Sequence, residues 1–435
     1  MAERAYARTG VVDMDALEQG MRAAAMKDGA AALSSLLSKI GDPAPGTVAC
    51  PDCAARMESL GRRRKDLTTL LGTTPLERPY YACTQPGCEG HAFPKDALLD
   101  VAETGFSPGV RRLMARSGAR DSFAKGEEDL WVYSGIRVRE KDVERIAEAV
   151  GADIECRAQA TRKEICAGRA EPPPPEEAIP ILYVGGDGTG VPVTKRETAG
   201  RKGKQPDGTA KTREAKVGCV FTQVGTDEKG RPVREEGSTT YTGAIETAEV
   251  FGERLYAEAV ARGLLHADLV VVLGDGAPWI WNLAELHFPG AIHIVDLYHA
   301  REHLYALLRL LFPDDAVRDA CRTEWLGWLE DGKIERLVDA ATTILPLAEN
   351  ARKLATNETD YFSTNAKRMR YADFRARKLF VGSGVVEAGC KTVVASRMKK
   401  SGAKWSVRGA NAIIALRCAL LSQRFDDYWA LRSAA

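Results

Sequence analysis

Runs of apolar residues in the second half of the chain predict a sheet of buried strands. Leu269 to Leu273 and Ala291 to Val295 are short β-branched and aliphatic runs without polar alternation. Such runs are typical of strands that helices cover on both faces, as in a parallel sheet. A helix-length segment lies between them, and each run is followed within two residues by an aspartate, Asp275 or Asp296. We therefore expect both aspartates at the carboxyl edge of the sheet, where open α/β sheets place their chemistry.

Earlier segments extend this predicted sheet. Three strands and an amphipathic helix are expected at Ile179 to Val193, Val217 to Val224, Ser238 to Ile245 and Glu246 to Gly263. The order is then three strands, helix, strand, helix, strand, which is the order of the α/β ribonuclease H-like fold. In that fold the first and fourth strands are neighbours. Asp187, on the first strand, is therefore expected to converge with Asp275.

The rest of the chain has helical periodicity. Residues 11–40 and 95–167 are predicted helical, and His299 to Arg370 has no strand pattern. Phe123 to Gly151, with a turn at Ser134-Gly135, fits a helix-turn-helix reading head and fits any helical hairpin equally well. Four consecutive prolines after Glu171 form a stiff spacer and the clearest domain boundary.

Composition narrows the functional class only a little. The chain has 435 residues and a net charge of +1, so any binding of nucleic acid must come from local basic segments. No apolar run approaches the roughly 20 residues of a membrane span, and the N-terminus lacks the apolar core of a signal peptide. We expect a cytoplasmic protein without a membrane partner. Ten cysteines are too dilute for a disulfide scaffold.

Four of the cysteines are clustered. Cys50 and Cys53 form one close pair, and Cys83 and Cys88 form another. Two such pairs can supply four thiolates to a structural zinc ion, although two unrelated pairs of thiols remain the alternative. Between the pairs, Arg62, Arg63, Arg64 and Lys65 are expected at the tip of a ribbon hairpin, either as a phosphate-binding surface or as a solvated loop.

Two more basic segments are candidates for contact with DNA. The polar stretch after the first strand contains Arg201, Lys202 and Lys204, and is either a gripping loop or a disordered one. Near the C-terminus, Arg397, Lys399, Lys400 and Lys404 precede a final helix. Trp405, which lies among them, is the candidate for stacking on a base.

A third carboxylate completes a candidate metal site. Glu387 lies in the first turns of a helix that Ser383 is expected to cap. With Asp187 and Asp275 it could hold two Mg²⁺ or Mn²⁺ ions, for which oxygen ligands are suited. Such a pair of ions activates an attacking water or 3′-hydroxyl and stabilises a leaving oxygen.

These motifs together resemble the DDE transposases of bacterial insertion sequences, and most closely the ISKra-type family. The resemblance covers most of the chain and comprises the four-cysteine ribbon, VGGDGTGVPV around Asp187, LGDGAPWIWNLA around Asp275, DLYH from Asp296 to His299, and SGVVEAGCKTVVASRMKKSGAKWS around Glu387. The DLYH segment matches the [C/D]xxH pattern shared with mutator-like transposases.

The resemblance implies an activity and a partner. Asp187, Asp275 and Glu387 would bind the catalytic metal ions, with Asp296 and His299 as supporting residues. The reaction would be cleavage at transposon ends and transfer of the freed 3′ ends into target DNA. Double-stranded DNA would be the partner, a homodimer would hold two ends together, and the bacterial protein would be associated with the nucleoid when bound to DNA.

Three other functions remain open. A nuclease on the same fold would cut without joining. His299, Glu302 and His303 match HxxEH, the inverted zinc-peptidase motif, which needs a third ligand from another helix. A zinc-ribbon DNA binder without enzymatic activity would use the aspartates only as caps and turns.

The expected organisation follows from these assignments. It consists of N-terminal helices (1–46), a zinc-ribbon module (47–95), a helical region that includes the candidate helix-turn-helix (96–170), a proline-rich linker (171–178), the first part of the ribonuclease H-like core (179–300), an all-helical insertion (301–380), and a catalytic helix with a basic C-terminal region (381–435).

Overall fold

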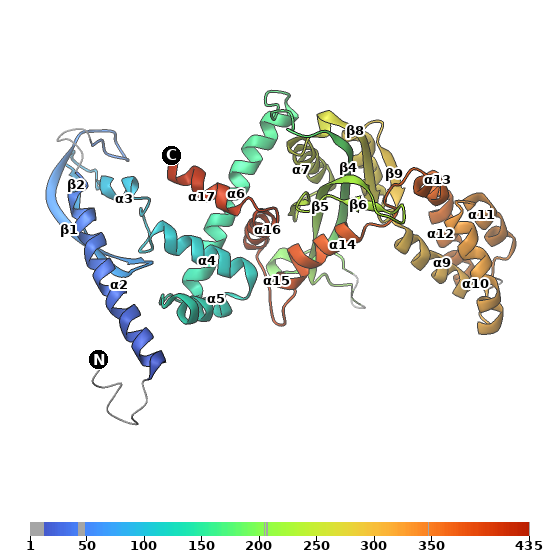
Figure 1. Cartoon of the computed structure of the whole chain (residues 1–435), viewed down its shortest axis with the longest axis horizontal. Helices are drawn as coiled ribbons and strands as arrows, with labels where there is room; N and C mark the ends of the chain where they lie inside the picture. Colours follow the sequence, from blue (N-terminus) through green and yellow to red (C-terminus); the bar gives the residue numbers. More distant parts are fainter. Residues whose placement is uncertain (1–12, 42–47, 204, 206–207, 347, 435) are drawn as a thin grey trace. The chain divides into compact units, whose positions relative to one another are not determined.

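The chain divides into two compact units, Met1–Ala147 and Glu148–Ala435. The computed structural model describes residues 13–41, 48–203, 205, 208–346 and 348–434. The division falls inside the long helix α6 (Glu140–Cys166), upstream of the proline-rich segment at which we expected a boundary. The architecture is mixed α/β, with a helical N-terminal region and a mixed sheet in the second unit (Figure 1).

A long hairpin organises the first unit. Strands β1 (Met57–Thr69) and β2 (Gly72–Cys83) are antiparallel, and β2 also pairs with the short β3 (His91–Ala92). The hairpin turns at Leu70 and Leu71, and Gly72 closes it with a φ of 106°.

The tip of this hairpin is apolar, so the expectation of a basic tip is wrong. Arg62 to Lys65 lie within β1, opposite Leu76 to Pro79 of β2. The turn uses only two leucines followed by a glycine, and leucines give no turn signal in a sequence. Thr69 stabilises the turn instead, because its hydroxyl donates to the Gly72 carbonyl at 2.7 Å.

Helices complete the first unit. They are α2 (Met14–Lys39), α3 (Pro94–Leu98), α4 (Pro108–Arg120), α5 (Phe123–Asp129), the π-helical turn η1 (Leu130–Ser134) and the start of α6. Ser107 caps α4, and its hydroxyl accepts from the N–H of Val110 at 3.4 Å. The predicted turn at Ser134-Gly135 is confirmed, since Gly135 ends η1 with a φ of 71°.

The second unit is built on a mixed sheet. Its strands are β4 (Ile179–Pro192), β5 (Thr212–Thr226), β6 (Pro232–Arg234), β7 (Thr240–Ala244), β8 (Ala267–Gly274) and β9 (Ile292–Val295). The order is β6-β5-β4-β8-β9, and β7 pairs with β5. β5 is antiparallel to β4 and β7, whereas β4, β8 and β9 are parallel. The five predicted strands are confirmed, and β6 is an additional short strand between the second and third of them.

Helices cover both faces of this sheet. Gly185 of β4 lies under Val386 of α14 (Gly384–Gly389), while the next residue, Gly186, lies under Phe251 of α7 (Ala248–Ala261). Successive strand residues point to opposite faces, so α14 and α7 lie on opposite sides of β4.

The remaining elements of the second unit are η2 (Lys195–Thr198), η3 (Leu264–His266), α8 (Pro278–His287), the π-helical η5 (Cys390–Ala395), α15 (Ser396–Met398), α16 (Val407–Leu421) and α17 (Phe425–Ala434).

The C-terminal segment seals the sheet at its edge strand, β7. Ser422 follows α16, and its hydroxyl accepts from the N–H of Tyr241 at 2.8 Å. Asn411 accepts from the N–H of Ile245 at 2.8 Å. Because exposed edge groups invite pairing with another chain, these side chains protect the sheet from edge-to-edge association.

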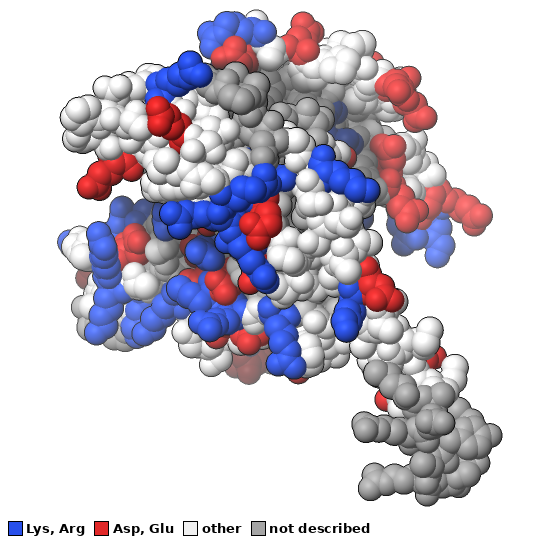
Figure 2. Space-filling model, turned by 90° about the vertical axis from the view of Figure 1, so that its left-hand side faces the viewer, with Lys and Arg blue, Asp and Glu red and all other residues white. Residues whose placement is uncertain are grey.

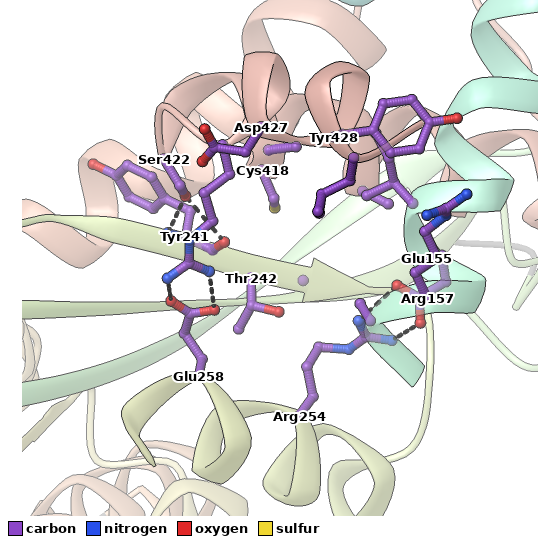
Figure 3. Close-up of a pocket in the computed structure, with 17 residues that line it drawn as sticks. Glu155, Arg157, Tyr241, Thr242, Arg254, Glu258, Cys418, Ser422, Asp427 and Tyr428 are labelled. Carbon is purple, nitrogen blue, oxygen red and sulfur yellow. Dashed lines mark hydrogen bonds and ion pairs between the residues drawn. The ribbon is translucent and has the colours of Figure 1, made fainter. Parts of the chain in front are cut away.

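A cavity of about 370 Å³ lies behind this seal (Figure 3). Ion pairs flank it: Arg254 donates to Glu155 at 2.7 and 2.8 Å, and Arg424 donates to Glu258 at 2.8 and 2.9 Å. Figure 3 shows these pairs joining α6, α7 and the segment before α17 around β7. Their positive and negative side chains satisfy one another, so the cavity belongs to the packing of the edge.

Residues 297–376 form a group of helices between β9 and α14. They are α9 (Leu297–Leu311), α10 (Asp315–Glu330), α11 (Ile334–Thr343), α12 (Glu349–Asn365), the short η4 (Ala366–Arg368) and α13 (Tyr371–Ala376). Trp325 and Leu329 are buried on one face of α10, and Trp328 is partly buried against the same core. Figure 1 shows α10 to α13 gathered beyond β9. Within the described residues, no helix has the length and apolar character needed to cross a membrane.

Candidate active site and metal centre

Three aspartates lie on neighbouring strands of the sheet: Asp187 lies within β4, whereas Asp275 and Asp296 directly follow β8 and β9. Gly185 of β4 is level with Leu273 of β8, so Asp187 and Asp275, each two residues further, continue the same register. Gly274 of β8 is level with Val295 of β9, which places Asp296 beside Asp275. Neighbouring strands lie about 4.8 Å apart. The predicted placement of Asp275 and Asp296 at the carboxyl edge is confirmed, and the row of carboxylates continues to Asp187 within β4.

The carboxyl group of Asp187 has a raised pKa. Burial raises the pKa of its carboxyl group, and the nearby charge of Asp275 raises it further, while the N–H of Gly188, which donates at 2.6 Å, lowers it. The thiol of Cys390, on η5, contacts the same carboxylate, and burial raises the pKa of that thiol. A cation between two neighbouring carboxylates would stabilise the ionised form of both.

Helix α12 and the residues after β8 hold Asp275 in place. Its carboxylate accepts from the N–H of Ala277 at 2.8 Å, and its carbonyl accepts from the hydroxyl of Tyr361, on α12, at 2.9 Å. Gly276, with a φ of 102°, makes room for this contact, because a Cβ there would lie 2.5 Å from the Tyr361 ring. The sequence analysis did not find Tyr361. No local pattern marks it, since it lies 86 residues from Asp275.

Asp296 connects the starts of two helices, α9 and α14, through hydrogen bonds to its carboxylate. It caps α9, where one carboxylate oxygen accepts from the N–H of His299 at 2.9 Å. The other oxygen accepts from the N–H of Ser383, directly before α14. Its side chain is 2% exposed. Both oxygens are thus engaged by backbone groups, and the carboxylate fixes the start of α14 relative to the end of β9.

Glu387 lies on the same face of the sheet as Asp187. It is exposed in the first turn of α14, one helical turn before Cys390, the residue that contacts Asp187. Val386 packs on Gly185, which orients the helix. The expected cap is absent, since the Ser383 side chain makes no capping hydrogen bond.

The oxygens of the three predicted metal ligands are not gathered around one point. Among the described residues, no group of acidic or histidine side chains brings three ligand atoms within 4.8 Å of one another. Ligands that flank two ions about 3.5–4 Å apart are spread more widely than ligands of a single ion. The arrangement is therefore unsuited to one tightly held ion, and the assignment of Asp187, Asp275 and Glu387 stays a prediction.

The HxxEH residues have other partners. His303 lies 2.6 Å from Glu358 through its Nδ1 and stacks on Tyr361 with ring centroids 3.7 Å apart. His299 lies 3.5 Å from Glu302. In a peptidase of this kind the two histidines and a third ligand converge on one zinc ion. No such convergence occurs among the described residues, so the peptidase interpretation gains no support.

The four clustered cysteines could hold a zinc ion. The sulfur atoms of Cys50, Cys53, Cys83 and Cys88 all lie within 4.8 Å of one another. Cys50 and Cys88 are 3.6 Å apart, and Cys53 and Cys83 are 3.5 Å apart. Sulfur atoms of a tetrahedral Zn–S site with bonds of about 2.3 Å are separated by about 3.8 Å.

The backbone around these cysteines is shaped for thiolates. A hydrogen bond from the Cys53 backbone lowers the pKa of the Cys50 thiol to about 7. Backbone hydrogen bonds also lower the pKa of Cys53 and Cys88, but the neighbouring sulfur atoms raise both above the usual value. A Cβ at Gly90 would lie 2.3 Å from the sulfur of Cys50, so only glycine fits beside the cluster. The four cysteine sulfurs and the close fit of Gly90 beside them both suit a structural zinc ion.

The predicted DNA-binding residues differ in exposure. Arg62, Arg63, Arg64, Arg201, Lys202, Lys399 and Lys404 are exposed, Lys400 is partly exposed, and Lys204 lies outside the described residues. Figure 2, which faces the side of Figure 1 where β1 and β2 lie, shows lysine and arginine side chains gathered on that face. Lys399 donates to Thr189 at 2.6 Å, which brings it close to Asp187 along β4.

Three residues that were predicted to contact DNA are enclosed by other parts of the chain, so these predictions are wrong. Lys65 is enclosed, and its ammonium group binds Asp96 at 3.1 Å and the carbonyl of Val101 at 2.6 Å. Arg397 is 2% exposed and Trp405 7% exposed, and the indole N–H donates to the Met398 carbonyl at 3.1 Å. Trp405 therefore anchors its loop and does not present a ring for base stacking. A basic sequence context does not reveal which way a side chain points.

Comparison of the chain with protein-family models and with curated proteins finds no match in either.

Proposed function

We propose that this chain is a metal-dependent DNA transposase that cleaves the ends of an insertion sequence and joins them to target DNA. The observation that carries the proposal is the closeness of Asp187, within β4, to Asp275, directly after the adjacent strand β8, with α14 and Glu387 on the same face. The resemblance of the surrounding motifs to ISKra-type DDE transposases supports the same function.

The strand order supports a ribonuclease H-like core. Counting β4, β5, β7, β8 and β9 as strands one to five, the sheet order becomes three, two, one, four, five, with only the second strand antiparallel to its neighbours. The helices from α9 to α13 then form an insertion before the helix that carries Glu387.

Asp187, Asp275 and Glu387 would hold two Mg²⁺ or Mn²⁺ ions. When bound, these ions activate the attacking oxygen and stabilise the leaving 3′-oxygen. The raised pKa of Asp187 fits this role, because two close carboxylates are stabilised by cations. Tyr361 fixes the position of Asp275 through its carbonyl, and Asp296 fixes the start of the helix that carries Glu387.

DNA would bind to basic residues in both units. Arg62 to Arg64 on β1 and the exposed arginines near the start of α6, Arg137, Arg139 and Arg145, are candidates to contact phosphates or bases. In the second unit, Arg201, Lys202, Lys399 and Lys404 are exposed, and Lys399 contacts Thr189, two residues from Asp187. Two DNA ends must be held for joining, so a homodimer is the proposed active form.

An assay of cleavage and joining tests the proposal. The full chain is incubated with Mg²⁺, a labelled duplex carrying the element's own end and a supercoiled target. Wild type should cleave and join, while Asp275→Asn and Glu387→Gln should keep DNA binding and lose activity by at least about a thousandfold. Asp268→Asn, an exposed aspartate at the opposite end of β8, is the matched control and should stay active.

Other outcomes separate the alternatives. Cleavage without joining would identify a nuclease. Undiminished activity of the Asp275 and Glu387 variants would refute the proposed metal ligands.

A further inference from the structure

A second cavity lies beside Asp296, at one end of the carboxylate row. It has a volume of about 710 Å³ and lies between the β5–β6 turn, the start of α9 and the segment that leads from α13 into α14. Gly382 lies in this last segment, and a Cβ there would be 3.8 Å from the carboxylate of Asp296. Tyr298, which lines the cavity beside this segment, lies between Asp296 and His299 in the sequence. We call this cavity the Tyr298 groove.

An aromatic ring is displayed in the groove. Tyr298 is 65% exposed, although it belongs to the first turn of a helix whose other face is buried. Its ring lies against the Gly382 backbone, where an added Cβ would be 3.1 Å from the ring. The guanidinium group of Arg301 also lies over the ring, 5.5 Å from its centroid. Most of the tyrosine nevertheless faces the groove and solvent.

The groove is also cationic. Arg231, Arg301 and Arg375 line it, with side chains that are 70%, 29% and 43% exposed. Their acidic partners are Asp227, 2.7 Å from Arg231, and Glu330, which both other arginines share. Three guanidinium groups thus face only two carboxylates, which leaves one positive charge in excess. Among the described residues, the Nε of Arg301 has no hydrogen-bond partner.

We propose that the Tyr298 groove binds an unpaired nucleotide of the DNA strand that is engaged at the carboxylate row. This inference rests on the proposed function. The ring of Tyr298 offers a face on which a base can stack, and the arginines offer donors to the flanking phosphates. A base within a duplex is already stacked on its neighbours, so only an unpaired one can use the ring. The volume falls within the range of small-ligand sites and admits a nucleotide.

Fluorescence of labelled DNA tests the groove. The full chain is titrated, without divalent cations, with a duplex that ends in three unpaired nucleotides, one of them 2-aminopurine, and with the same duplex fully paired. Wild type should bind the unpaired form more tightly and quench its fluorescence. Tyr298→Ala should weaken binding of the unpaired form by about tenfold and leave the paired form unaffected. Tyr298→Phe, which keeps the ring, should restore both readouts.

Two further variants sharpen the result. Tyr305→Ala, at an exposed tyrosine on α9 outside the groove, should behave as wild type. Arg231→Gln should weaken binding of the unpaired form and lower its salt dependence by about one counterion.

The outcomes distinguish this inference from the proposed function. If wild type binds paired DNA but Tyr298→Ala changes neither affinity nor quenching for the unpaired form, the groove proposal is overturned and the transposase proposal stands. If wild type binds neither DNA, both are overturned.

Discussion

At the scale of single residues, the partly buried carboxyl group of Asp187 makes the stability of the folded chain depend on pH. Burial raises the pKa of its carboxyl group in the folded chain. A raised acid pKa means that this group favours the folded state at pH values below its unfolded pKa, and that this contribution is lost as the pH rises through the folded pKa. At neutral pH the ionised carboxylate therefore destabilises the folded chain unless a cation binds to it.

Replacing Asp187 should reveal this cost. Asp187→Asn keeps an oxygen for the N–H of Gly188 and removes the charge, so without metal it should stabilise the chain by about 0.5–2 kcal/mol at pH 7. Near pH 3 the difference should vanish, because the wild-type group is then protonated. Denaturant unfolding at the two pH values measures the effect, with the exposed Asp268→Asn as control. A variant less stable than wild type at pH 7 would refute the argument.

Tyr361 should act through Asp275. Tyr361→Phe removes the hydroxyl that donates to the Asp275 carbonyl, which should lower the free energy of unfolding by about 1 kcal/mol. Under the proposed function it should also lower the rate of cleavage by about tenfold without changing the affinity for DNA, since the residue positions a metal ligand and does not touch DNA.

A matched variant separates these effects. Tyr428→Phe removes a hydroxyl contact with Asp153 at 2.8 Å, away from the carboxylate row. It should lower stability to a similar extent and leave the cleavage rate unchanged. Equal cleavage rates for the two variants would remove Tyr361 from the positioning role.

At the scale of elements, the cysteine cluster depends on the turn that follows it. The Gly90 carbonyl accepts from the N–H of Cys83 at 2.8 Å, so the second cysteine pair is clamped by backbone against β2. Met57 and Tyr81 pack beside Cys50, and this small core is too limited to fix the hairpin end alone. A bound zinc ion would supply the missing constraint.

Gly90→Ala should weaken zinc binding by about 10–100-fold, because the added methyl group would meet the sulfur of Cys50. Competition with a coloured zinc chelator measures the affinity in the full chain. Gly105→Ala is the control, since a Cβ there would approach only the Asp66 carbonyl, at 3.9 Å. Unchanged zinc affinity in Gly90→Ala would show that the cluster can rearrange around the methyl group.

At the scale of the whole molecule, the two compact units should respond differently to loss of zinc. The cysteine cluster lies in Met1–Ala147, whereas the carboxylate row lies in Glu148–Ala435. Each unit has its own buried residues, among them Met114 and Val143 in the first and the large cluster around Tyr183 in the second.

Calorimetry of the full chain tests this independence. A zinc chelator should lower the unfolding temperature of one transition by about 10 °C or more and leave the other unchanged, because loss of about 3 kcal/mol shifts a unit of this size by that amount. A single transition that shifts as a whole would mean that the units unfold together.

The sequence by itself determined the local features. The five strands, the turn at Ser134-Gly135, the cysteine pairs and the placement of Asp275 and Asp296 at strand ends followed from hydrophobic period, glycine and spacing, which act over a few residues. The row of Asp187, Asp275 and Asp296 followed once the strand order was inferred, because parallel strands end at one edge. The metal-ligand assignment and the transposase function remain proposals.

Only the tertiary structure decided which way side chains point and which distant residues meet. Lys65, Arg397 and Trp405 belong to basic segments, yet their burial depends on surfaces contributed by other parts of the chain. The contacts of Tyr361 with Asp275 and of Ser383 with Asp296 join residues 86 and 87 positions apart. Periodicity records which face of an element is buried. It carries no information about which distant element covers that face.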